Sequence, residues 1–177
     1  MQAHRFPHES MTGRPMLRDA HPADFPAILA LNEAFVAVLS PLDAGRLAQL
    51  HEQAVVHRVI ERDGRIEAFL LAFREGADYD GANYRWFAQR HARFLYVDRI
   101  VVAGGGQAEG IGSRLYADVR TRALADAVPL IACEFDIDPP NPASARFHAR
   151  QGFHEVGQRR VDGGKVVSMQ VLDLASR

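Results

Sequence analysis

Residues 94–113 read FLYVDRIVVAGGGQAEGIGS, and this stretch decides how the chain folds. Its apolar first half predicts a buried strand over residues 94–102. A glycine-rich turn follows, and the pattern then predicts a helix from about Ser113 to Asp126. The first amides of such a helix have no intrahelical partner, and the helix dipole favours negative charge beside them.

Gly110 and Gly112 lack side chains, so a bulky anion such as a pyrophosphate can approach the backbone at this helix start. The alternative is a tight turn that needs glycine only for its dihedral angles. Two well-known phosphate loops do not match. A Walker loop needs a lysine that is missing here, and the dinucleotide fingerprint does not align with the glycines of residues 104–106.

The flanking segments predict a mixed α/β domain of three layers, in the order β-α-α-β-β-β-α-β-α-β-β. Asp63-Gly64 predicts a hairpin, and residues 75–93 are expected to form an irregular loop with one helical turn. The expected strands are residues 16–18, 55–61, 66–73, 94–102, 130–137, 153–161 and 166–173. The expected helices are residues 22–39, a short one capped by Asp43, residues 113–126, and one that Asn141 caps and Gly152 ends.

The chain has 177 residues, a formal net charge of −1 and one cysteine, Cys133. That charge balance argues against a broad nucleic-acid surface, and the single cysteine excludes an intrachain disulfide. No apolar run approaches the roughly 20 residues of a membrane span. We therefore expect a flexible tail over residues 1–14 and one domain over residues 15–177. The location should be cytoplasmic, with no membrane or nucleic-acid partner.

The turn resembles the acetyl-CoA signature of the GCN5-related N-acetyltransferase (GNAT) superfamily. That signature, Arg/Gln-x-x-Gly-x-Gly/Ala, follows a strand ending in valine, and here it reads Gln107-Ala108-Glu109-Gly110-Ile111-Gly112 after Val102. A second match begins at Asn141-Pro142 and ends in Gln151-Gly152-Phe153. Two motifs in the right order, with the right elements between them, are more specific than either one.

The resemblance implies a GNAT-like α/β/α domain whose central parallel strands, residues 94–102 and 130–137, splay apart around acetyl-CoA. It implies direct acetyl transfer to an amine without an acyl-enzyme, so we interpret Cys133 as a packing residue. It also implies that a backbone amide near Val102 polarises the thioester carbonyl. The implied cofactor-binding residues are Val102, Gln107, Ala108, Glu109, Gly110, Ile111, Gly112, Ser113 and Asn141.

Charged residues interrupt both central strands. Strand alternation places Asp98 on the face of Tyr96, Ile100 and Val102, with Arg99 on the other face. Because burying charge is costly unless the charge is paired or used, Asp98 and Glu134 are candidates for binding or deprotonating the amine. The alternative is an ion pair that only orders the sheet.

His148 occupies the position where the resemblance implies a tyrosine that protonates the leaving thiolate. Histidine can donate a proton near neutral pH, so His148 is a candidate acid. It can equally be a CoA contact or a hydrogen-bonded helix residue. Tyr116 lies too early in the chain to match that tyrosine. The remaining histidines are scattered and predict no metal site.

Tyr84, Trp86 and Phe87 are candidates for the wall of an acceptor pocket, although they can also seal their loop to the sheet. The predicted function is acetyl transfer from acetyl-CoA to a primary amine of a small molecule. Two alternatives stay open: a CoA-binding regulatory protein without turnover, and a generic phosphate- or nucleotide-binding module. The exposed edge of the terminal hairpin could support a homodimer.

Overall fold

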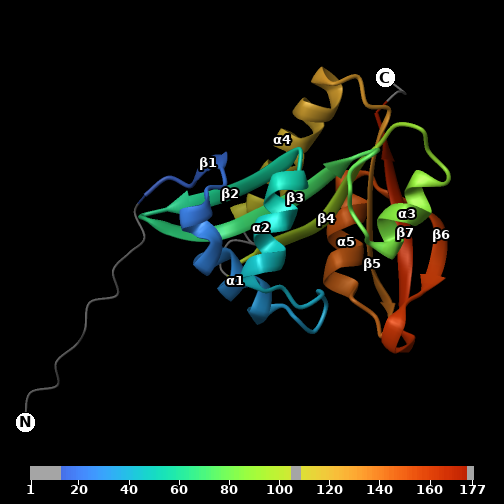
Figure 1. The fold of residues 1–177 in the computed structure, drawn as a ribbon, viewed down its shortest axis with the longest axis horizontal. Coiled ribbons are helices and arrows are strands. Elements are labelled where there is room, and N and C mark those ends of the chain that lie inside the picture. The colour runs from blue at the N-terminus through green and yellow to red at the C-terminus, as the bar shows by residue number, and fades with distance from the viewer. Residues whose placement is uncertain (1–12, 105–108, 175–177) are drawn as a thin grey trace, which may run out of the picture.

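The computed structural model describes residues 13–104 and 109–174, which form one seven-stranded sheet flanked by helices (Figure 1). Most of the predicted tail over residues 1–14 therefore lies outside the described residues. The strand order is β1-β2-β3-β4-β5-β7-β6. The strands are β1 (Met16–Asp19), β2 (Val56–Arg62), β3 (Arg65–Arg74), β4 (Leu95–Val102), β5 (Leu130–Asp138), β6 (His154–Arg160) and β7 (Val166–Asp173).

The helices agree with the predicted order, with one addition. They are α1 (Phe25–Ala34), α2 (Ala44–Gln53), α3 (Ala82–Ala88), α4 (Ile111–Ala125) and α5 (Pro142–Gln151). Short 3-10 turns, η1 (Pro22–Asp24) and η3 (Asp162–Gly164), complete the list. The addition is α3, which lies inside the segment expected to be mostly irregular. The first helix is shorter than expected, because η1 precedes it and it ends at Ala34.

Local signals place several of these boundaries. The Asp43 side chain accepts a hydrogen bond from the Arg46 amide at 2.7 Å and caps α2. The Asn141 side chain accepts one from the Ser144 amide at 3.1 Å and caps α5, which ends at Gly152 with φ of 94°. Asp63 and Gly64 both have positive φ in the β2–β3 turn, as a tight hairpin requires. These four predictions are confirmed.

The sheet has helices on both faces. Adjacent residues of a strand point to opposite faces, so neighbours such as Phe69 and Leu70 enter different cores. Phe69 packs with Ile28 and Leu47 of α1 and α2, whereas Leu70 packs with Leu115 of α4. The third core places α3 against β4, β5 and β7. The predicted three-layer arrangement is therefore confirmed (Figure 1). In the described residues, no helix has the length and apolarity to cross a membrane.

The central strands β4 and β5 are the one parallel pair in the described sheet, and they stay together only briefly. Their pairing comprises Leu95 with Ile131 and Tyr96 with Ala132. Beyond Tyr96 the strands separate, while β4 remains paired with β3 and β5 with β7. The predicted splay is confirmed. Backbone groups along the opened edges are left without a sheet partner across the gap.

A β-bulge in β4 corrects the predicted alternation. Leu71 of β3 pairs with Arg99 and Ala72 pairs with Val97, so Asp98 is the extra residue. Ile100 and Val102 therefore pack in the α4-side core with Val97, and not on the face of Tyr96. Arg99 lies on the same side as Asp98, with 2.6 Å between its Nε and the Asp98 Oδ2. The expectation that Asp98 and Arg99 face opposite sides is wrong.

Candidate active site

The gap between β4 and β5 is a cleft of about 740 Å³. Its walls come from the two strands, the start of α4, one side of α5 and residues 35–39 after α1. The cleft is lined by residues that include Asp98, Val102, Gly110, Gly112, Ser113, Tyr116, Cys133, Glu134, Asn141 and His148. Candidate residues that lie far apart in the sequence thus share one cavity.

One end of the cleft is the start of α4. Gly110 is the N-cap residue, has φ of 73° and gives no side-chain cap, so the amides that follow are available to a ligand. Gly112 is needed for close packing, since a Cβ there would lie 2.9 Å from the Phe147 Cζ. The Ser113 Oγ accepts a hydrogen bond from the Gln151 side chain at 2.8 Å.

The remaining predicted cofactor residues are placed differently. The Glu109 side chain pairs with Arg62, which also holds Glu67 at 3.1 Å, so this carboxylate fastens the turn to the β2–β3 hairpin. The Ile111 side chain is buried in the core. Gln107 and Ala108 lie outside the described residues. Asn141 lines the cleft while its side chain caps α5.

Glu134 of β5 is partly buried as a residue, and burial of its carboxyl raises the carboxyl pKa to about 7. Its Oε1 accepts two hydrogen bonds of 2.9 Å, from the Asn83 Nδ2 and from the Tyr96 hydroxyl. Its Oε2 is buried and has no hydrogen-bond partner among the described residues. The carboxyl therefore carries one saturated oxygen and one free oxygen, and it titrates near neutral pH.

Asp98 is arranged differently, although it lines the same cleft. It pairs with Arg99 and accepts a hydrogen bond from the Tyr79 hydroxyl. The Arg99 guanidinium also donates to the Asn32 Oδ1 of α1 at 2.8 Å. Asp98 thus belongs to a buried ion pair that ties β4 to α1.

His148 is 4% exposed, and both of its ring nitrogens have partners. Nδ1 lies 2.9 Å from the Ser144 carbonyl oxygen, and because a carbonyl only accepts, Nδ1 carries the proton. Nε2 then accepts from the Tyr116 hydroxyl, 2.9 Å away. Burial lowers the pKa of His148, so its ring is neutral near pH 7. Burial likewise raises the pKa of the neighbouring Cys133, which stays a thiol.

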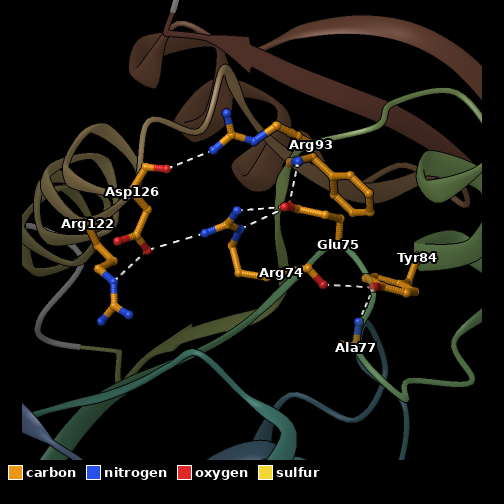
Figure 2. Close-up of polar contacts among 8 residues, drawn as sticks. Arg74, Glu75, Ala77, Tyr84, Arg93, Arg122 and Asp126 are labelled. Carbon is orange, nitrogen blue, oxygen red and sulfur yellow. Dashed lines mark hydrogen bonds and ion pairs between the residues drawn. The ribbon is translucent and has the colours of Figure 1, made fainter.

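The aromatic residues of α3 do not line the cleft. Tyr84 and Phe87 are buried in the core beside β4. The Trp86 ring lies against Gly157 of β6, where a Cβ would come within 2.8 Å of the ring. The Tyr84 hydroxyl donates to the Arg74 carbonyl at 2.8 Å and accepts from the Ala77 amide at 2.9 Å (Figure 2). These contacts seal the segment to the sheet.

An ion-pair cluster anchors the same segment at its start. Figure 2 shows Arg74 beside Glu75, with the Arg74 Nη2 2.6 Å from the Glu75 Oε1, and reaching Asp126 at the end of α4. Arg93 donates to the Asp126 carbonyl at 3.0 Å. Both ends of residues 75–93 are thereby fixed. This fixes the position of α3, and with it the Asn83 side chain that donates to Glu134.

Sequence reasoning missed the residues that surround the three candidate side chains, Asp98, Glu134 and His148. Asn83, Tyr96 and Tyr79 hold the carboxyls, and Tyr116 holds His148. No local spacing could have found these partners, because they join segments 19 to 51 residues apart. A buried tyrosine is a usable signal, because its hydroxyl needs a partner.

A sheet opened between two parallel strands, beside an uncapped glycine-rich helix start and a buried carboxyl, defines a protein of the acetyltransferase class. Residues 16–153 match the model of the acetyltransferase (GNAT) family, and the chain belongs to that family. The predicted resemblance is therefore confirmed.

Three relatives illustrate the likeness. A phosphinothricin N-acetyltransferase of Streptomyces coelicolor is 44% identical over 66 residues, a stretch that spans 37% of this chain and 37% of that protein. Ard1 from Thermoplasma volcanium superposes with a TM-score of 0.74 at 12% identity, over 90% of this chain and 97% of that one. The putative acetyltransferase yncA from Salmonella typhimurium, solved with acetyl-CoA, has a TM-score of 0.69 at 19% identity, over 93% and 96%.

Proposed function

We propose that this chain is an acetyl-CoA-dependent N-acetyltransferase that moves an acetyl group directly to a primary amine of a small molecule. The observation that carries the proposal is Glu134, a buried carboxyl with one free oxygen and a pKa of about 7 where the central strands separate. A group that titrates near the working pH is suited to general-base catalysis.

In this proposal the cleft holds acetyl-CoA, which would supply the thioester. The free amides at the start of α4 would hold the anionic end, with Gly110 leaving room for its approach and Gly112 allowing the Phe147 ring to pack beside the turn. Ser113, Val102 and Asn141 line the cleft beyond these glycines. We also propose cofactor contacts for Gln107, Ala108, Glu109 and Ile111, through their backbone. We propose that the reaction uses no metal.

The Glu134 Oε2 would accept the proton of the acceptor's ammonium group and release the amine for attack. Asp98 would act through its pair with Arg99, keeping the bulged β4 in place beside the amine. The leaving thiolate would receive its proton from the Tyr116–His148 pair. The Tyr116 hydroxyl is the donor within that pair, since the neutral His148 ring has given its only N–H to Ser144.

The first acceptor to test is phosphinothricin, because a relative that is similar over 66 residues is named for it. The test supplies acetyl-CoA with phosphinothricin and a panel of other primary amines, and it measures thiol release. We expect turnover with at least one amine and a fall on the order of 10²-fold in Glu134→Gln.

Thermal shifts separate the alternatives. Stabilisation by acetyl-CoA without turnover on any amine would indicate a regulatory protein, and stabilisation by ATP but not by CoA would indicate a nucleotide-binding module. We propose a cytoplasmic location. A homodimer that uses the exposed edge of β6 stays a prediction, to be checked by light scattering.

A further inference from the structure

A chain of hydrogen bonds runs from the sheet edge to the candidate base. Arg159 of β6 donates from its Nη1 to the Asn83 Oδ1 of α3. Asn83 in turn donates from its Nδ2 to the Glu134 Oε1 of β5 at 2.9 Å. Three elements that are separate in sequence thus meet in one line, and β6 and α3 lie next to each other in Figure 1.

Arg159 decides which end of the Asn83 amide faces Glu134. An asparagine side chain carries a donor at one end and an acceptor at the other, and it can turn over. A guanidinium has donors only, so the Asn83 oxygen must face Arg159 and the Asn83 NH2 group must face the carboxyl. The reversed amide would set its oxygen against the Glu134 carboxylate, which is repulsive.

This orientation also decides which oxygen of Glu134 is free. Oε1 receives both the Asn83 NH2 and the Tyr96 hydroxyl, whereas Oε2 receives nothing from the described residues. The lone pairs left for an incoming ammonium group are therefore on Oε2. Loss of the Asn83 donor would leave Tyr96 alone to hold the carboxyl, which could then rotate about its terminal bond.

Arg159 has no carboxylate partner within the described parts of the chain, and its side chain is only half-buried. Its neighbour Arg160 is exposed and donates to the Gly164 carbonyl at 3.0 Å, away from the cleft. One strand thus presents two arginines of the same size. Only Arg159 is connected to Glu134.

Among the ionisable groups that face Glu134, Arg159 is the cation that has no anion paired with it in the described residues. Asp98 of β4 is the facing anion, and it is paired with Arg99. The remaining groups stay neutral near pH 7, because burial raises the pKa of each: Tyr79 before α3, Tyr96 of β4, Tyr116 of α4 and Cys133 of β5.

We propose that Arg159 is a positioning residue, which acts through Asn83 to fix the Glu134 carboxyl so that its Oε2 is the oxygen left without a hydrogen-bond partner. This inference rests on the proposed function, since it concerns the base of that reaction. Arg159 itself touches no reacting atom.

The test uses the full chain and three variants: Arg159→Met, Arg159→Gln and the matched control Arg160→Met. The first readout is the titration of the Glu134 carboxyl by NMR of 13C-glutamate-labelled protein, with its signal assigned from Glu134→Gln. The second is the pH profile of kcat/KM for acetyl transfer from acetyl-CoA to phosphinothricin or to the best amine of the panel. Circular dichroism checks that each variant is folded.

Arg159→Met removes the positive charge and the contact that orients the Asn83 amide. The titration midpoint of Glu134 should therefore rise by on the order of one pH unit, and the acid limb of the kcat/KM profile should move to higher pH by the same amount. Arg160→Met should follow the wild type. Arg159→Gln keeps a donor for Asn83 without the charge, so its shift should be smaller.

A Glu134 titration that is identical in Arg159→Met, Arg159→Gln and Arg160→Met would overturn the proposal. The NMR arm needs no turnover. If every amine proves inert while the Arg159 variants still move the Glu134 midpoint, the proposed function fails and the coupling through Asn83 stands.

Discussion

Glu134 and Asp98 are buried carboxyls in one cleft, and their partners give them different roles. Glu134 has two neutral donors on one oxygen and none on the other. Asp98 has a cation and a hydroxyl. The ion pair with Arg99 gives Asp98 a structural role in the sheet, whereas burial raises the pKa of the Glu134 carboxyl to about 7, where it can exchange its proton near neutral pH.

This contrast predicts different pH–rate profiles for two isosteric variants. Glu134→Gln should lose the acid limb of kcat/KM together with most of the rate, because no base remains. Asp98→Asn should keep the limb but move it to lower pH, since the Asp98 charge raises the pKa of Glu134. Initial rates of thiol release between pH 5.5 and about 9 would test both. An unchanged limb in Glu134→Gln would assign the base elsewhere.

At the scale of elements, the start of α4 depends on how closely α5 approaches it. A Cβ on Gly112 would meet the Phe147 ring at 2.9 Å, so Gly112→Ala must displace that ring or the helix. We expect a loss of about 1–3 kcal/mol in stability, as for other overpacked contacts, and a higher KM for acetyl-CoA. Gly45→Ala is the control, because a Cβ in that helix position makes only ordinary contacts.

A double variant shows whether the contact is the cause. Phe147→Leu removes the ring, so Gly112→Ala added to Phe147→Leu should cost much less than Gly112→Ala alone. Additive losses in thermal unfolding would mean that the alanine acts through the backbone of the turn instead.

Elements that depend on local chemistry could be predicted from the sequence, and those that depend on partners could not. The Asn141 cap and the Gly152 end of α5 are fixed within a few residues of themselves. The bulge at Asp98 is different, because the extra residue exists only relative to β3. Likewise, α3 has no side-chain cap that would predict its start from the sequence. Its position is fixed by the Arg74–Glu75 ion pair and by packing in the aromatic core.

The candidate site divides in the same way. The glycines of the turn and Glu134 could be predicted from the sequence. The glycines belong to a recognisable motif, and Glu134 is a charged residue in a largely apolar strand. The contacts that give these residues their chemistry were not, since Tyr116 meets His148 across 32 residues and Asn83 meets Glu134 across 51.

For the whole molecule, two buried groups set opposite pH dependences of stability. Burial raises the pKa of Glu134 to about 7, above its ordinary 4.5, so the native state loses stability as pH rises across that interval. Burial and the facing His51 lower the pKa of His57 to about 4, below its ordinary 6.5, so stability is lost as pH falls. Each effect is on the order of 3 kcal/mol, and the two oppose each other between about pH 4.5 and 6.5.

Removing either group should therefore reveal the pH dependence of stability that the other group causes. His57→Phe should lose thermal stability as the pH rises from 5 to 8, and Glu134→Gln should lose it as the pH falls over the same range. The wild type should vary less than either variant. Melting temperatures of the three proteins at pH 5, 6.5 and 8 would decide, and parallel curves would count against this compensation.

The brief pairing of β4 with β5 has a consequence for exchange kinetics. Amides in the middle of a sheet are ordinarily the slowest to trade their protons with solvent. Here the two central strands share only the pairs at Leu95 and Tyr96, so past Tyr96 each has a free edge inside the sheet. Deuterium should enter the amides on those inner edges about as quickly as at an outer strand, so the middle of this sheet should lack the slow exchange that a sheet centre normally shows.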